Sequence, residues 1–193
     1  MTKKTAIRKK PITKGFSTGI SQHLSVERVI IGGAIVVSLM VVGIFIAIQP
    51  PGINYSQPDK SQIFPDLGRQ HVGKGTPHPP YNSNPPTSGW HDPQPAAWGV
   101  YLSVIPDENV IHSMEHGGVW LSYRDVDDAE TVQQLQDIAR RYPSHVIMTH
   151  RPANDSRIAV AAWGHLLKMD KVDSGQIYDF IARYRMHGPE NVQ

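Results

Sequence analysis

The chain has 193 residues, with 19 basic and 17 acidic side chains, 10 histidines and no cysteine. The lack of cysteine excludes disulfides, thiolate catalysis and cysteine-based zinc sites. Residues 1–28 hold seven of the basic residues and one acidic residue, so the rest of the chain is mildly acidic, which argues against a nucleic-acid-binding surface.

A long apolar run predicts one transmembrane helix at residues 29–48. The run begins at Val29, ends at Ile48 and contains no charged side chain, and about 20 such residues span the roughly 30 Å hydrocarbon core of a bilayer. By the positive-inside rule, the basic residues before it predict a cytoplasmic tail over 1–28. Since no Ala-x-Ala cleavage pattern follows, we expect an uncleaved signal anchor in the cell membrane. The helix would contact membrane lipid, and the C-terminal part would be extracytoplasmic.

Two proline-containing segments follow the apolar run. Residues 49–76 are mostly polar and predict a stalk. Residues 77–95 hold seven of the chain's 16 prolines, which excludes a helix or a central strand. Because aromatic residues such as Tyr81 and Trp90 are unusual in a solvated linker, we expect an ordered, extended loop that lies on the domain and delivers His91 to a site.

The remaining sequence predicts alternating strands and helices. Apolar patterns typical of strands occur at 99–105, 119–123, 146–149 and 158–167. One helix is expected after Asp127, with Glu130 in the capping-box position, and another after Asp173 or Ser174. This order predicts a single α+β domain over 77–193, with a mostly antiparallel sheet and two helices on one face.

The segment 112–116, His-Ser-Met-Glu-His, is the strongest functional signal. Side chains four residues apart share a face in a helix and in a strand, so both of its histidines can converge on one ion in either conformation. Imidazole suits copper, zinc, iron and nickel, and thioether favours Cu(I). We therefore predict a copper or zinc site and no organic cofactor. The candidate ligands carry imidazole or thioether groups: His91, His112, His116, His150, Met114 and Met148.

The same segment allows a metal-dependent hydrolase. His-x-x-Glu-His matches a zinc-peptidase pattern in which two histidines bind the ion and the glutamate, here Glu115, activates water as the general base. In a helix Glu115 would lie beside His112, as this chemistry requires. A peptidase is excluded, because Gly117 and Gly118 follow at once and a strand begins at Val119, which leaves no long helix.

A third interpretation needs no metal. Buried histidines commonly hydrogen-bond to backbone carbonyls, and the four tryptophans could be core or interface anchors. The domain would then be a non-catalytic interaction or scaffolding module for another envelope protein. His71, in the expected stalk, is expected to be solvated. We favour metal binding without catalysis over the hydrolase and the scaffold.

Three motifs resemble a bacterial family. They are Asn-Pro-Pro-Thr-Ser-Gly-Trp-His at 84–91, Gly-Val-Tyr at 99–101 and His-Ser-Met-Glu-His-Gly-Gly-Val at 112–119. This combination resembles the domain-of-unknown-function family 3105, from about Ile63 to the C-terminus. The resemblance implies a membrane-anchored exported domain and brings no established activity.

Overall fold

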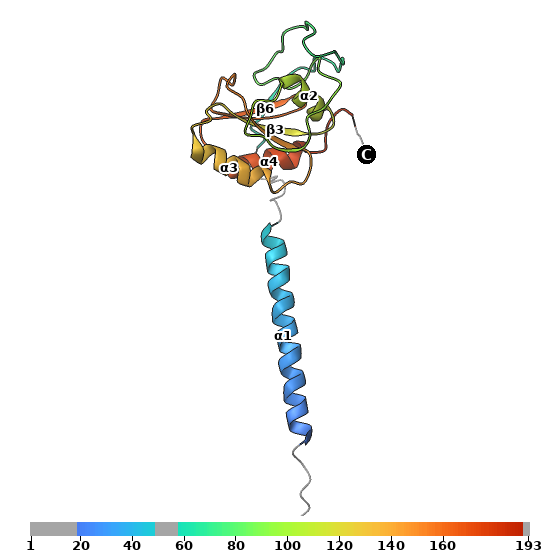
Figure 1. Ribbon diagram of the computed structural model, residues 1–193, viewed down its shortest axis with the longest axis vertical. Helices are drawn as coiled ribbons and strands as arrows, with labels where there is room; N and C mark the ends of the chain where they lie inside the picture. The colour runs from blue at the N-terminus through green and yellow to red at the C-terminus, as the bar shows by residue number, and fades with distance from the viewer. Residues whose placement is uncertain (1–18, 49–57, 191–193) are drawn as a thin grey trace, which may run out of the picture. The chain divides into compact units, whose positions relative to one another are not determined.

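The computed structural model describes residues 19–48 and 58–190, and the chain divides into two compact units, 1–48 and 49–193 (Figure 1). In the first unit, α1 (Gly19–Ile48) contains the predicted apolar run. Its 18-residue window Arg28–Phe45 has a mean hydropathy of 2.4. This helix is long and apolar enough to cross a membrane, and its length and composition suit a membrane anchor or a signal sequence. Residues 1–18 of the predicted cytoplasmic tail lie outside the described residues.

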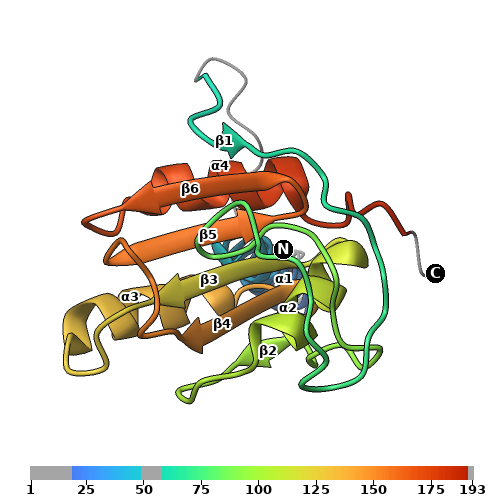
Figure 2. The same ribbon diagram turned by 90° about the horizontal axis from the view of Figure 1, so that it is seen from above.

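The second unit is built on a six-stranded mixed sheet in the order β1-β6-β5-β3-β4-β2 (Figure 2). The sheet is antiparallel from β1 to β3, while β4 runs parallel to both β3 and β2. The parallel β3–β4 pair is joined through a helix, the connection that parallel neighbours need. The strands are β1 (Gln62–Ile63), β2 (Gly99–Val100), β3 (Val119–Tyr123), β4 (Val146–His150), β5 (Ile158–Ala162) and β6 (His165–Met169).

Helices cover both faces of the sheet, so its central strands are buried on both sides. On one face, α3 (Ala129–Ala139) and α4 (Ser174–Tyr184) pack on alternate residues of the strands, such as Leu121 and Val160. On the other face, α2 (Asp107–Glu115) packs on the intervening residues, such as Trp120 and Ile147. Figure 1 shows this division into layers. The predicted α+β class and the two helices on one face are confirmed, and the third helix on the opposite face is an addition.

Several element boundaries differ from the prediction. The expected strand 99–105 is paired only over Gly99–Val100. The expected long strand 158–167 is wrong: it is the hairpin β5–β6, turned at Trp163 and Gly164, where Gly164 has a φ of 74°. The sequence contains no strong turn signal there, since the apolar pattern continues through the hairpin. Asp128, rather than Asp127, caps α3 by accepting a hydrogen bond from the Thr131 amide.

The proline-containing segments are folded onto the domain. Residues 85–89 are buried, which confirms the expectation of an ordered loop. Residues 62–72, which we expected in the stalk, also belong to the folded domain. β1 pairs with β6, the Phe64 amide donates to Gly164 O at 2.8 Å, and His71 forms a parallel bridge with His91. The rest of the predicted stalk, from 49 to 57, lies outside the described residues.

Candidate metal site

Helix α2 presents two candidate ligands on one face. His112 and Glu115 are three residues apart, so their side chains point the same way in a helix. The opposite face of α2 carries Val110, Ile111 and Met114, which pack into the core on the sheet. The helix is thereby fixed in rotation, and His112 and Glu115 are 5% and 2% exposed.

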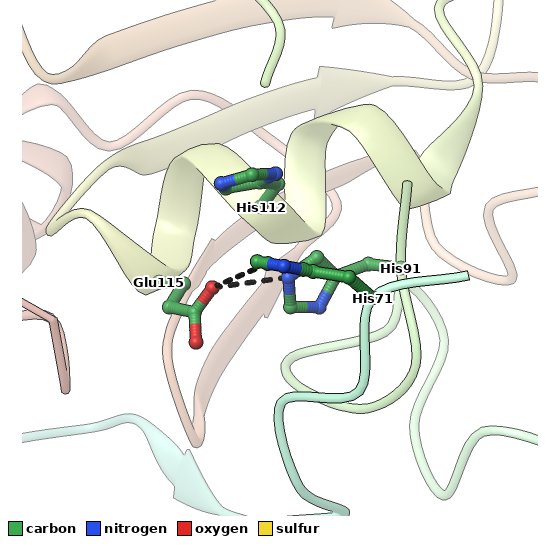
Figure 3. A group of neighbouring side chains, drawn as sticks. All are labelled: His71, His91, His112 and Glu115. Atoms are coloured by element: carbon green, nitrogen blue, oxygen red, sulfur yellow. Dashed lines mark hydrogen bonds and ion pairs between the residues drawn. The ribbon is translucent and has the colours of Figure 1, made fainter. Parts of the chain in front are cut away.

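Two further imidazoles come from neighbouring irregular segments that run side by side. The His91 amide donates to Gln70 O at 3.0 Å, and the Val72 amide donates to His91 O at 2.8 Å. These bonds bring His71 and His91 together although they are far apart in the sequence. Both rings reach the side of α2 that faces away from the sheet, where His112 and Glu115 lie (Figure 3).

The four side chains converge on one point. One ligand atom from each of His71, His91, His112 and Glu115 lies within 4.8 Å of all the others. The nearest contacts join Glu115 Oε2 to His91 Nε2 at 3.0 Å and to His71 Nε2 at 3.4 Å. Three imidazoles and one carboxylate at this spacing match the ligand number and type of a first-row divalent metal site.

Backbone carbonyls orient two of the imidazoles. His91 Nδ1 lies 2.7 Å from Gly89 O, and His112 Nδ1 lies 2.7 Å from Asp92 O. Because a carbonyl only accepts, both Nδ1 atoms carry hydrogen, and Nε2 is the atom of each neutral ring that is left to bind an ion. The second nitrogen of metal-binding histidines is typically held in this way.

The contact between His91 and Glu115 needs a positive charge between the two groups. With hydrogen on Nδ1, the neutral His91 ring directs the lone pair of Nε2 at a carboxylate oxygen 3.0 Å away. Two acceptors repel each other at this distance unless a proton or a metal ion lies between them. The buried carboxylate therefore favours a cation beside His91 Nε2, either a proton or a metal ion.

Burial also favours the metal-binding form of His112. Its pKa lies below the ordinary value of 6.5, chiefly because burial disfavours the charged ring, and the neighbouring His91, His116 and His71 lower it further. The hydrogen bond to Asp92 O acts in the opposite direction. His112 therefore stays neutral, and able to bind a metal, at pH values where an ordinary histidine is charged.

We expect the metal-free protein to lose stability as the pH falls from about 7.5 to about 5. Burial lowers the pKa of His112, His145 and His165 below 6.5 in the folded state. As the pH falls through 6.5, the unfolded chain binds more protons than the folded chain, so the free energy of unfolding decreases. Urea denaturation with a chelator present measures this, and His165→Gln should reduce the slope. A stability that is constant or rises on acidification would contradict the expectation.

The structure brings together some of the candidate ligands and separates others. His91, His112 and Glu115 belong to the cluster, and the His116 ring stacks on His112 at 4.7 Å. However, His116 Nδ1 faces Glu190 at 3.8 Å and lies outside the group of four. The remaining candidates are elsewhere: His150 stacks on Tyr123, while Met114 and Met148 lie in the cores on opposite faces of the sheet.

Helical geometry explains why the thioether is absent from the cluster. The prediction that Met114 joins the histidines required an extended segment, in which alternate residues share a face. The segment is helical, so Met114, two residues from His112, points to the opposite face and into the core. His116 is the C-cap residue of the same helix.

His71 was not among the predicted ligands, because it was expected in a solvated stalk. The signal that could have located it is the apolar pair Ile63-Phe64 within an otherwise polar segment. Ile63 pairs with β6 at the edge of the sheet, and Phe64 packs against the core under α2. Arg69, whose Nε lies 3.7 Å from Glu115 Oε1, was missed for the same reason.

These features define a single α+β domain that follows one apolar helix and carries a cluster of three histidines and one glutamate, in which only His71 is exposed. The chain belongs to the family described as "Protein of unknown function (DUF3105)", whose model matches residues 71–193. The match includes all four residues of the cluster. Searches of curated proteins and of solved structures found no match.

Proposed function

We propose that the domain binds one divalent transition-metal ion, with zinc as the best candidate, through His71, His91, His112 and Glu115. The observation that carries this proposal is the convergence of four ligand atoms within 4.8 Å, with two imidazoles already oriented by backbone carbonyls. A cysteine-free chain has no thiolate to offer, and imidazole with carboxylate is the common alternative for zinc.

The donor set favours divalent ions over Cu(I). Cu(I) prefers thioether and thiolate ligands, and the two candidate thioethers, Met114 and Met148, lie in the hydrophobic cores. Nitrogen and carboxylate donors suit Zn²⁺, and Cu²⁺ competes by its general affinity for imidazole. The proposal therefore favours a divalent ion over Cu(I).

We place the metal-binding domain outside the cytoplasm, anchored by α1. The support is the apolar length of the helix and the excess of basic residues before it, which favours a cytoplasmic N-terminus. In an oxidising compartment a cysteine-free domain gains no stability from disulfides. A bound ion linking three chain segments would supply part of what disulfides supply elsewhere.

A metal-dependent hydrolase is the second candidate function. The observation in its favour is the exposure of the site on one side, where 45% of the His71 side chain is accessible and water can reach the cluster. In this case the three histidines hold the ion, and Glu115 acts as a general base on bound water. Glu115→Gln separates the candidates: the affinity for Zn²⁺ should fall at least about tenfold if the carboxylate is a ligand. It should be retained if the carboxylate is the base.

We expect the full chain, purified in detergent without a histidine tag, to bind Zn²⁺ in a one-to-one ratio. Changing both His91 and His112 to alanine should abolish this binding, because two of the three imidazoles are lost. Elemental analysis and competition with a chromophoric chelator measure it, and added Zn²⁺ should raise the melting temperature of the wild type only. His150→Ala, which removes an imidazole outside the cluster, is the control.

Two results would contradict the proposal. One is a wild-type chain that remains metal-free after reconstitution, which would favour the interaction module with an envelope partner. The other is unchanged zinc content in the double variant. Since His91 is buried, circular dichroism must show that the variant is folded, and His71→Ala, which removes the exposed imidazole of the cluster, provides an independent test if it is not.

A further inference from the structure

The two oxygens of the Glu115 carboxylate face different partners. Oε2 is the atom near the imidazoles, at 3.0 Å from His91 Nε2 and 3.4 Å from His71 Nε2. Oε1, the second oxygen, lies 3.7 Å from Nε of Arg69. Only one oxygen therefore faces the position that an ion would take, and the other faces a permanent positive charge.

The Arg69 backbone is held in place by its neighbours. Arg69 lies between two residues whose backbone is hydrogen-bonded to the segment that carries His91: Gly68 O accepts from the Gly89 amide, and Gln70 O accepts from the His91 amide. Its guanidinium also donates from Nη1 to Pro189 O at 3.5 Å. The C-terminal segment that provides this carbonyl is itself bonded to α2, because the Glu190 amide donates to Glu115 O at 3.0 Å.

A carboxylate can bind a metal through one oxygen or through both. Binding through both adds a ligand atom and suits ions that take six or more ligands, whereas Zn²⁺ in protein sites is almost always four-coordinate. A guanidinium that pairs with Oε1 lowers the ability of this oxygen to bind a second cation. It also repels an ion that approaches from its side.

We propose that Arg69 is a positioning residue that restricts Glu115 to binding a metal ion through Oε2 alone. The site thereby selects four-coordinate ions such as Zn²⁺ and Co²⁺ over ions of higher coordination number such as Mn²⁺. This inference rests on the proposed metal site and specifies its selectivity. Arg69 acts through Glu115 and does not itself bind the ion. Its side chain is 51% exposed, so solvent weakens the pair and the expected effect is moderate.

The test uses Co²⁺ as a spectroscopic probe bound to the full chain in detergent. Wild type should give the intense visible absorption of four-coordinate Co²⁺. Arg69→Gln should weaken and shift this absorption as Oε1 joins the ion. The preference for Zn²⁺ over Mn²⁺ should fall by roughly tenfold, the low end of what loss of a residue behind a metal ligand costs. Arg69→Lys keeps the charge and should retain part of the wild-type spectrum.

Arg124→Gln is the matched control, because it removes the same charge from an exposed arginine that directly follows β3. It should leave both the spectrum and the selectivity unchanged. A wild type that binds neither Co²⁺ nor Zn²⁺ would overturn the proposed function itself. A wild type that binds Co²⁺ with the weak spectrum of a higher coordination number would overturn the role of Arg69 alone. An Arg69→Gln variant with the wild-type spectrum and selectivity would do the same.

Discussion

Gly188→Ala should have two effects at once: it should destabilise the domain by about 3 kcal/mol and weaken metal binding. A Cβ atom at this position would lie 2.1 Å from Glu115 O and 2.3 Å from the Gly117 nitrogen. Both are backbone atoms at the end of α2, so no side-chain rotation relieves the overlap. The C-terminal segment must separate from α2, or the backbone of Glu115 must move. Thermal denaturation and Zn²⁺ titration of the same sample measure the two effects.

The control for this prediction is another glycine in the same part of the chain. At Gly175, in the first turn of α4, an added Cβ would meet only Asp173 Oδ1 at 3.4 Å. Gly175→Ala should therefore be neutral or stabilise the helix by up to about 1 kcal/mol. A Gly188→Ala protein as stable as the wild type would show that the contact between the C-terminal segment and α2 is not required.

Arg151→Met should cost about 2 kcal/mol of stability, because it leaves the part-buried Asp107 carboxylate, whose side chain is 25% exposed, without its partner. Arg151 is 8% exposed and forms a two-pronged ion pair with Asp107, at 2.9 Å from Nε and 2.7 Å from Nη2. Its Nη1 donates to Asn84 and Asn154. Asp107 is the first residue of α2, so this network ties the helix that carries His112 to the end of β4. Urea denaturation measures the loss.

An exposed ion pair of the same length provides the comparison. Lys168 Nζ lies 2.7 Å from Asp155 Oδ2, with 32% and 51% of the two side chains accessible. Lys168→Met should therefore change stability by less than about 1 kcal/mol. In addition, Asp107→Asn combined with Arg151→Met should be more stable than Arg151→Met alone, since no part-buried charge remains unpaired. Equal losses of stability in Lys168→Met and Arg151→Met would show that burial does not determine the effect.

The features that local patterns determine were predicted well from the sequence. The apolar run at 29–48 forms part of a long helix, the periodicity of 174–184 is as expected, and Asp173 is the cap of the two residues that the sequence offered. The α+β class and two helices on one face followed from the order of these elements. Glu115 was expected beside His112 only if the segment was helical, and the segment is helical.

The features that the sequence did not reveal depend on contacts between distant residues. The parallel pairing of β4 with β3 and β2, and the two-residue lengths of β1 and β2, are set by tertiary packing rather than by propensity. His71 enters the site only because residues 68–72 run beside 89–91, and no local pattern in a polar segment reports such a pairing. The orientation of α2 on the sheet also depends on tertiary packing, and it places Met114 in the core and His112 in the cluster.

The two edge strands of the sheet affect the tendency of the domain to aggregate at high concentration. A long exposed edge offers unpaired backbone groups that can add strands from other molecules, a common start of aggregation. Here the outermost strands, β1 and β2, are two residues long. A neighbouring chain would find at most a short ladder to extend at either side. The inner strands β5 and β3 are paired on both sides, and β6 and β4 are each covered at two residues of their outer edge, which shortens the ladder that another molecule could extend.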